Sequence, residues 1–150
     1  MNVLAIGAHF DDLELGCGGT LIKHVKRGDA VTMLVVTKSS YNDTEGNVIR
    51  ISDIAFEEGN KAASIIGAKL ECLNFDTFMV TFDEDLTSKL RYYIEDSKID
   101  IIYTHWIHDI HRDHHSITKS ALMAGRHVPR VLMYRSNYYD SEQSFIGNFY

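Results

Sequence analysis

Short apolar runs alternate along the chain with longer segments in which apolar residues recur at helical spacing. The runs predict strands at residues 3–7, 31–37, 70–75, 99–104 and 131–134. The segments with helical spacing are residues 16–26, 52–66, 83–96 and 116–127. The polar segment 39–50 predicts a loop, and Ser52 is a candidate N-cap for the helix that follows it.

The run at residues 31–37 is typical of a strand that is covered on both faces. It reads V-T-M-L-V-V-T, which is nearly all apolar or β-branched. Strands that alternate with helices favour a parallel sheet with helices on both faces, joined by right-handed crossovers. We therefore predict an α/β, Rossmann-like three-layer fold, whose ligands bind beyond the carboxyl ends of the strands where the strand order reverses.

Composition restricts the class of protein. A chain of 150 residues suits one domain, and 45% hydrophobic with 24% charged residues is an ordinary globular balance. The net charge of −6 argues against general binding to nucleic acid or anionic membranes. No stretch reaches the roughly 20 apolar residues that span a bilayer, and the first residues lack the basic region of a signal peptide. The two widely spaced cysteines, Cys17 and Cys72, favour a reduced, cytoplasmic protein.

Titratable residues gather in two segments that directly follow predicted strands. The first segment reads G-A-H-F-D-D-L-E at residues 7–14. The second reads T-H-W-I-H-D-I-H-R-D-H-H at residues 104–115 and holds five of the eight histidines. Because both segments lie at carboxyl ends of strands, we expect the fold to bring them face to face.

The residue types in these segments suit metal-dependent hydrolysis. A catalytic zinc takes three nitrogen or oxygen ligands and keeps one position for water, which becomes a nucleophile near neutral pH. Hydrolysis also needs a base and a donor for the developing oxyanion, and the segments hold enough histidines and carboxylates for each role. Neither segment pairs a serine or cysteine nucleophile with a histidine, and the first lacks the G-x-G-x-x-G order of a dinucleotide site.

Both segments resemble the signatures of one enzyme family. A-H-F-D-D-L-E at residues 8–14 resembles the A-H-P-D-D-x-E signature of the LmbE-like (PIG-L) zinc-dependent N-deacetylases. D-I-H-R-D-H at residues 109–114 resembles their second signature, D-x-H-x-D-H. Softer matches are G-C-G-G-T-L at residues 16–21 and Glu58 followed by Ala62-Ala63 and Ile66-Gly67. The resemblance spans essentially the whole chain, and the two motifs in this order make it specific.

The resemblance implies a metal site and a cofactor. It assigns His9, Asp12 and His114 as zinc ligands. Neutral histidine and carboxylate ligands suit several divalent ions, so iron is an alternative metal.

The resemblance also implies catalytic roles. Asp11 would be the general base that acts on the zinc-bound water. His111 would stabilise the oxyanion, in one version as the protonated imidazolium, and Asp113 would orient or tune His111. The implied reaction is the removal of an acetyl group from an N-acetylated amino sugar or glycoside.

Three further residues are candidates for substrate binding. Arg50 lies before the second predicted helix, where family members often hold an arginine that contacts the substrate. Trp106 offers an apolar face to a sugar ring. We expect His108, like His105, to be a packing or substrate-wall residue rather than a metal ligand.

Two departures from the family pattern carry expectations. Phe10 replaces the usual proline and removes a fixed φ, which we expect to alter the rigidity of the loop without loss of metal. Family members are usually longer, so we expect residues 1–150 to form one domain that lacks the C-terminal portion of the sheet and of the substrate wall. Tyr138 and Tyr139, exposed for that reason, could promote association into a homo-oligomer.

Other interpretations stay open. A truncated or degenerate relative would act as a non-catalytic, metal-binding interaction module, although such a module has no need of a base at Asp11. A nucleotide-binding Rossmann protein would be stabilised by a nucleotide and not by zinc. For single residues, the acids at 11–14 could belong to a solvated turn that caps a helix, and His24 is expected on a solvated helix face.

Overall fold

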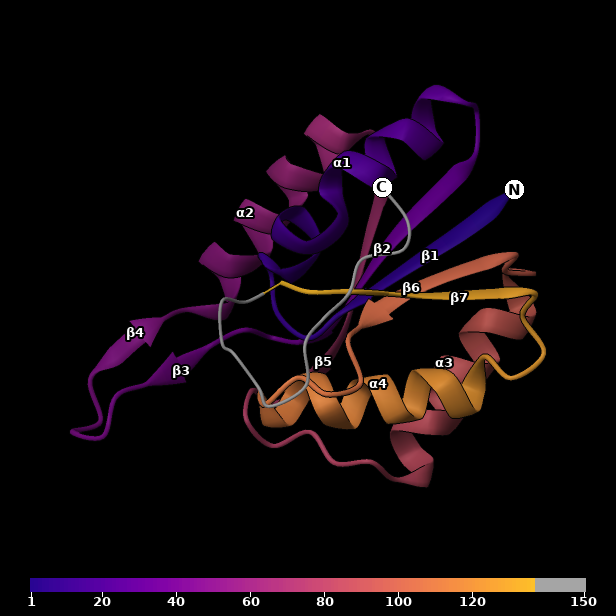
Figure 1. Ribbon diagram of the computed structural model, residues 1–150. Coiled ribbons are helices and arrows are strands. Elements are labelled where there is room, and N and C mark those ends of the chain that lie inside the picture. Colours follow the sequence, from indigo (N-terminus) through magenta and orange to yellow (C-terminus); the bar gives the residue numbers. More distant parts are fainter. Residues whose placement is uncertain (137–150) are drawn as a thin grey trace.

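The computed structural model describes residues 1–136 (Figure 1). The main strands are β1 (Asn2–Gly7), β2 (Ala30–Thr37), β5 (Lys69–Phe75), β6 (Ile101–His105) and β7 (Arg130–Tyr134). The helices are α1 (Asp12–Lys26), α2 (Ser52–Ile66), α3 (Glu84–Asp96) and α4 (Arg112–Ala124). Two short strands, β3 (Tyr41–Asn42) and β4 (Val48–Arg50), form a separate antiparallel hairpin.

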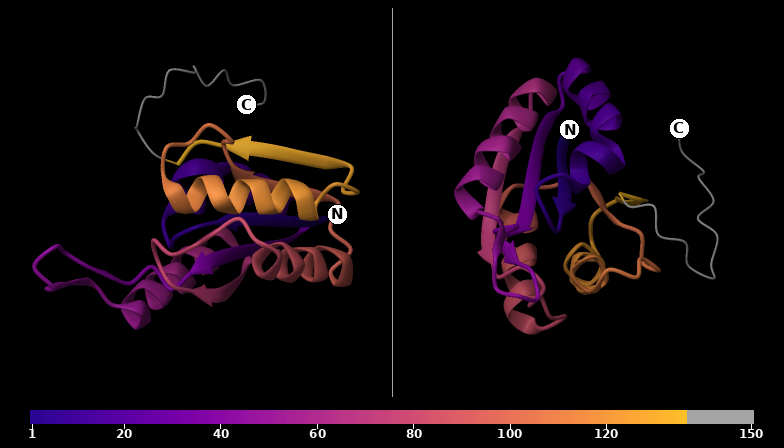
Figure 2. Two further views of the ribbon diagram at one scale, coloured as in Figure 1. Left: turned by 90° about the horizontal axis from the view of Figure 1, so that it is seen from below. Right: turned by 90° about the vertical axis from the view of Figure 1, so that its left-hand side faces the viewer.

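The five main strands form one parallel sheet in the order β5-β2-β1-β6-β7. Helices α1 and α2 cover one face of the sheet, and α3 and α4 cover the other (Figures 1 and 2). The strand order reverses between β1 and β6, so the loops that follow these two strands lie next to each other. The predicted α/β, Rossmann-like three-layer fold is confirmed.

Strand β1 is buried on both faces of the sheet. Val3 and Ala5 pack into the core beneath α1 and α2, whereas Leu4 and Ile6 pack into the core beneath α3 and α4. Successive side chains of a strand point to opposite faces, which explains this division. None of the four is more than 1% exposed. The loop that carries the first motif therefore starts from a rigid position.

Two helices begin inside the motifs, about one turn earlier than the apolar pattern predicts. Helix α1 begins at Asp12 and α4 at Arg112. The N-cap of α4 is His111, whose Nδ1 accepts a hydrogen bond from the backbone N–H of Asp113 at 3.2 Å. The polar residues of these first turns interrupt the apolar spacing, although Asp12 and Asp113 are themselves buried.

The segment predicted as a loop at residues 39–50 contains the β3–β4 hairpin, which projects from the body of the protein (Figure 1). The Asp43 carboxylate stabilises its turn by accepting backbone hydrogen bonds from the residues two and four positions later, both at 2.9 Å. The prediction of an N-cap at Ser52 is wrong. Ile51 occupies the N-cap position and makes no side-chain cap bond, and Ser52 is already inside the helix.

The expectation of a solvated His24 is also wrong. His24 is only 4% exposed, and its Nδ1 lies 2.7 Å from Oδ2 of Asp29. Its Nε2 lies 2.9 Å from the hydroxyl of Tyr103 on β6. The expectation failed because His24 has charged neighbours in the sequence, although its own face of α1 packs against the sheet.

Other expectations concern membranes, cysteines and association. Within residues 1–136, no helix combines the length and the apolar character needed to cross a membrane. Cys17 is buried and Cys72 half-buried, and neither forms a disulfide. Tyr138 and Tyr139, which carried the expectation of association, lie outside the described residues.

Candidate metal centre

The loops after β1 and β6 bring the three predicted metal ligands together. Nε2 of His114 lies 3.3 Å from Oδ1 of Asp12 and 3.4 Å from Nδ1 of His9. Nδ1 of His9 lies 3.5 Å from Oδ2 of Asp12. The side chains are at most 14% exposed. The fold therefore brings together two imidazoles and one carboxylate that are separated by up to 105 positions in the sequence.

The turn after β1 explains the position of Asp12. Its Oδ2 accepts hydrogen bonds from the backbone N–H groups of Ala8 at 3.1 Å and of His9 at 2.8 Å. The residue between, Asp11, has a φ of 155°, which is rare for a residue with a side chain. This tight turn fixes one carboxylate oxygen of Asp12 against the backbone and leaves Oδ1 beside His114.

Carboxylates also hold the outward nitrogens of the two histidines. Nδ1 of His114 lies 3.0 Å from Oδ2 of Asp109, and Nε2 of His9 lies 3.1 Å from Oδ2 of Asp113. Such a partner orients an imidazole and raises its basicity toward a metal. The Asp113 side chain was expected to orient His111, but it bonds to His9, and its backbone N–H is the group that bonds to His111.

The donor set suits a divalent cation. Two overlapping groups of donor atoms lie within 4.8 Å of one another: His9 with His111 and His114, and Asp12 with His105 and His114. Two histidine nitrogens that face each other at 3.4 Å need a shared cation or a proton between them. Two neutral imidazoles and a carboxylate are a common zinc set that leaves room for a further ligand.

His105 is close to the centre but its inner nitrogen is already engaged. Its Nε2 accepts the backbone N–H of Ala8 at 3.0 Å and lies 3.5 Å from Oδ2 of Asp12. Burial lowers the pKa of His105 to about 3, which keeps the ring neutral. The expectation that His105 is a packing or substrate-wall residue rather than a ligand stays a prediction.

The charge state of the two candidate histidine ligands predicts proton release on metal binding. Burial opposes protonation, but hydrogen bonds to Asp113 and Asp12 raise the pKa of His9 to about 9. For His114, hydrogen bonds to Asp109 and Asp12 likewise outweigh burial and give a pKa of about 9. The pair of rings therefore favours binding a proton when no metal is present, and both rings must be neutral to bind a metal.

We expect zinc binding near pH 7 to release at least about one proton per ion, and the affinity to rise at least about 10-fold per pH unit between pH 7 and 8. Calorimetric titration with zinc in buffers of different ionisation enthalpy measures the number of protons. A binding enthalpy that does not change with the buffer would contradict the assignment of His9 and His114.

A cavity of about 420 Å³ adjoins the cluster. It is lined by His9, Asp11, Ser39, Tyr41, Arg50, Thr77, Phe78 and His111. Of the three residues predicted to bind substrate, the cavity contains Arg50 but neither Trp106 nor His108. Instead, the rings of Trp106 and His108 contact each other with centroids 5.3 Å apart.

Asp11 has the properties of a base in this cavity. Its side chain is half exposed, and Oδ2 lies 3.7 Å from Nη1 of Arg50. Burial raises the pKa of Asp11, the charge of Asp12 adds to this effect, and the charge of Arg50 opposes it. A carboxylate that faces a cavity with a raised pKa can take a proton more readily than an ordinary aspartate.

The contacts of His111 indicate which of its ring nitrogens can donate a hydrogen bond. Burial and the charges of His114 and His9 lower the pKa of His111, which disfavours the protonated form that was one expectation. The backbone N–H of Asp113 donates to Nδ1, so the proton of the neutral ring is on Nε2. The neutral ring therefore still offers one N–H group to a developing oxyanion.

The structure accounts for Phe10 at the position where the signature has proline. Its backbone N–H donates to Oγ of Ser39 at 2.9 Å, a bond that proline cannot make. Its ring is 3% exposed and packs so closely on Gly59 that a Cβ there would lie 2.4 Å from Cδ1 of Phe10. The carbonyl of Phe10 accepts a bond from Arg50 at 2.9 Å. These contacts anchor the loop in place of the fixed φ.

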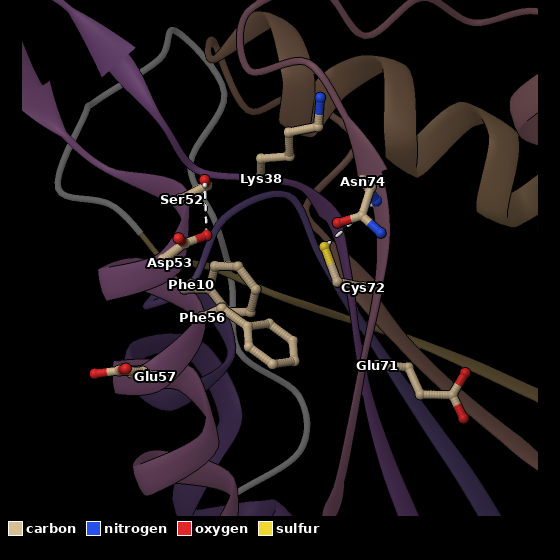
Figure 3. A pocket seen from close by; sticks show the side chains of 9 residues that line it. All are labelled: Phe10, Lys38, Ser52, Asp53, Phe56, Glu57, Glu71, Cys72 and Asn74. Atoms are coloured by element: carbon tan, nitrogen blue, oxygen red, sulfur yellow. Dashed lines mark hydrogen bonds between the residues drawn. The ribbon is translucent and has the colours of Figure 1, made fainter.

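A larger open groove of about 750 Å³ lies between α2 and β5 (Figure 3). Phe10 and Phe56 form its apolar side, and Cys72 donates from Sγ to the carbonyl of Thr37 at 3.3 Å. The described residues that line it include no histidine. The smaller cavity is therefore the one that adjoins the cluster of histidines and carboxylates.

Sequence reasoning missed several residues of the site. Asp109 stands in the second motif and could have been recognised as the partner of a histidine. Tyr41 and Phe78 lie in segments without a motif, and the backbone N–H of Phe78 donates to Oδ2 of Asp113 at 2.8 Å. Ser136 donates from Oγ to Oδ1 of Asp12 at 2.9 Å and follows β7, which lies beside β6.

Comparisons with known proteins agree with the motifs. A family model described as PIG-L, GlcNAc-PI de-N-acetylase, matches residues 4–124. The uncharacterized deacetylase YaiS from Escherichia coli K12 is 33% identical over 142 residues, which cover 90% of this chain and 74% of YaiS. The match to the family model includes the two motifs that form the cluster.

Two solved structures share the fold at low identity. N,N'-diacetylchitobiose deacetylase from Pyrococcus horikoshii has a TM-score of 0.75 at 21% identity, over 83% of this chain and 49% of that chain. The 4-carboxy-2-hydroxymuconate hydratase GalB from Pseudomonas putida has a TM-score of 0.71 at 20% identity, over 82% of this chain and 55% of that chain. The fold alone therefore does not decide the reaction. The match to the family model and the 33% identity to YaiS do identify the family: this chain belongs to the PIG-L (LmbE-like) family of deacetylases.

Proposed function

We propose that the chain is a zinc-dependent N-deacetylase that removes an acetyl group from an N-acetylated amino sugar or glycoside. The observation that carries this proposal is the convergence of His9, Asp12 and His114 beside a cavity that also contains Asp11 and His111. A metal site, a base and an N–H donor are the three parts that amide hydrolysis by water needs.

His9, Asp12 and His114 would hold the metal. When bound, zinc polarises the amide carbonyl and makes a water molecule nucleophilic near neutral pH. Iron is the alternative, because neutral imidazoles and a carboxylate suit several divalent ions. The carboxylates of Asp113 and Asp109 would keep His9 and His114 in the orientation that binding requires.

Asp11 and His111 would perform the proton transfer and stabilise the charge. Asp11 takes the proton from the attacking water and returns it to the leaving amine, so that the amine departs in a neutral form. Nε2–H of His111 donates to the oxygen of the acetyl carbonyl as negative charge develops there. Arg50, 3.7 Å from Asp11, keeps that carboxylate ionised before the reaction.

The walls of the cavity support a sugar-like substrate. The rings of Tyr41 and Phe78 stand edge to face with centroids 5.7 Å apart, and the cavity also offers the guanidinium of Arg50. The names of the family model and of the chitobiose deacetylase both refer to N-acetylglucosamine units. Substrate contacts by Trp106 and His108 stay a prediction, as do a cytoplasmic location and the lack of nucleic-acid partners.

The main alternative is a non-catalytic relative that binds a metal and another molecule. The position of Asp11 in the cavity speaks against it, because Asp11 lies outside both groups of converging donor atoms and is not needed to hold a metal. A hydratase such as GalB shares the fold, so the reaction itself has to be measured.

The test is acetate release from N-acetylglucosamine and from N,N'-diacetylchitobiose by the purified chain, together with elemental analysis. We expect about one zinc per chain, acetate from at least one substrate, and loss of activity on chelation. A chain that takes up no stoichiometric metal would contradict the proposal. Zinc without acetate from either sugar would reject this substrate class and favour the non-catalytic alternative.

A further inference from the structure

His105, the last residue of β6, is fully buried beside the candidate metal ligands His9, Asp12 and His114. Its ring stacks on the ring of His114 with centroids 3.9 Å apart and an interplanar angle of 11°. The backbone N–H of Ala8 donates to Nε2 of His105 at 3.0 Å. An amide N–H can only donate, so Nε2 is the acceptor and the proton of the neutral ring is on Nδ1.

Ser136 connects that proton to the Asp12 carboxylate. Its Oγ lies 3.4 Å from Nδ1 of His105 and 2.9 Å from Oδ1 of Asp12. An ionised carboxylate only accepts hydrogen bonds, so the Ser136 hydroxyl donates to Asp12 and its lone pair is left for His105. The hydrogen bonds therefore run in one direction, from Ala8 through His105 and Ser136 to Asp12.

The two oxygens of Asp12 consequently differ in their partners. Oδ2 accepts the backbone N–H of His9 and shares the N–H of Ala8 with Nε2 of His105. Oδ1 accepts the Ser136 hydroxyl and lies 3.3 Å from Nε2 of His114, on the side where the other donor atoms converge. A carboxylate oxygen has two lone pairs, so Oδ1 can accept from Ser136 and still bind a cation.

We propose that His105 and Ser136 are positioning residues, which orient Oδ1 of Asp12 for metal binding through this directional chain of hydrogen bonds. The proposal rests on the proposed function, because it requires Asp12 to be a metal ligand. It adds two residues to which the motifs assign no role, His105 at the end of β6 and Ser136 two positions after β7. Neither residue touches the substrate in this scheme.

Tyr134 keeps His105 in place. Its hydroxyl donates to the carbonyl of Ile6 at 2.8 Å, and its ring lies 4.9 Å from the His105 ring, centroid to centroid. The Tyr134 ring fits against Gly16, where an added Cβ would lie 2.2 Å from Cδ2. The buried histidine is thus enclosed by Tyr134 and by His114, which limits rotation of its ring.

The test compares zinc affinity in Ser136→Ala, Ser136→Thr and the wild type, by competition with a chelator. Loss of an outer partner of a metal ligand typically weakens binding about 10- to 100-fold, and we expect Ser136→Ala to do so. Ser136→Thr keeps the hydroxyl and should restore the affinity to within a few-fold. Ser120→Ala is the matched control, because Ser120 is also buried and its Oγ has no hydrogen-bond partner among the described residues.

Cobalt substitution gives a readout that a general loss of stability would not produce. We expect the visible absorption bands of bound cobalt to shift in Ser136→Ala and to match the wild type in Ser120→Ala and Ser136→Thr. If Ser136→Ala does not fold, as judged by circular dichroism, Ser136→Gly replaces it. Wild-type affinity and an unchanged cobalt spectrum in the folded variant without the hydroxyl would overturn the proposal.

The role of His105 has its own measurement. Nitrogen NMR of the metal-free wild type should show His105 as a neutral ring with its proton on Nδ1. A proton on Nε2 would break the inferred direction of the chain and overturn the proposal. Failure of the proposed function is distinct from these outcomes, because it would appear as a wild type that binds neither zinc nor cobalt, and it would remove both proposals together.

Discussion

Replacement of Asp11 by asparagine is expected to lower the turnover number for acetate release about 10²- to 10⁴-fold while zinc stays bound. Asparagine keeps the size of the side chain but cannot take a proton from water. Asp11 faces the cavity and lies outside the set of converging donor atoms, so the metal should be retained. Initial rates of acetate release, with metal content from elemental analysis, measure both effects.

Glu58→Gln is the matched control for this variant. The Glu58 carboxylate also pairs with Arg50, at 3.3 Å, but it does not line the cavity. Its neutralisation should change the turnover number less than tenfold if the base is Asp11. An Asp11→Asn enzyme that keeps its rate within tenfold, or one that loses its zinc, would contradict the assignment.

The pH profile gives an independent check of the same residue. A base works only when it is deprotonated, so activity falls as the pH falls through its pKa. Burial raises the pKa of Asp11, and the acidic limb of the rate profile should therefore lie at a higher pH than the ordinary value of 3.8. The Asp11→Asn variant should lack this limb.

Replacement of His114 by alanine is expected to remove stoichiometric zinc and, with it, the activity. His114 is the residue that lies close to both other candidate ligands, and it belongs to both groups of converging donor atoms. The loss of affinity should exceed the roughly 10- to 100-fold that loss of an outer partner causes. Zinc affinity and elemental analysis of the purified variant measure it.

His127→Ala is the control, because His127 is exposed and follows the end of α4. It should bind zinc as the wild type does. Zinc held by His114→Ala at wild-type affinity would show that the ion binds to other groups, and the ligand set of His9, Asp12 and His114 would then be wrong.

The fold could be predicted because local patterns encode it. Apolar runs such as residues 31–37 mark buried strands, and their alternation with helices leads to a parallel sheet. The reversal of strand order then places the loops after β1 and β6 side by side, which is why the sequence alone predicts that the two motifs meet. Helix starts were less accurate, because the first turns of α1 and α4 carry polar site residues instead of the apolar spacing.

The contacts of single side chains were harder to predict, because they depend on distant parts of the chain. Ser136 reaches Asp12 across 124 positions, and no local pattern marks it. The available signal is its position, because Ser136 follows the predicted strand at 131–134 and polar residues after the strands of such a sheet gather at the site. The expectation for His24 was wrong because its sequence neighbours are charged and gave no sign that its side chain is buried.

The separation of His9 and His114 by 105 positions also affects how the protein folds. The two residues meet only when β1 pairs with β6, so a long stretch of chain must be organised first. Parallel pairing between distant strands forms slowly compared with local helices. An ion held by both loops would stabilise the completed sheet but could not guide its early assembly. If the chain binds a metal as proposed, loading would therefore follow assembly of the sheet, and the metal-free sheet would have to be stable by itself until then.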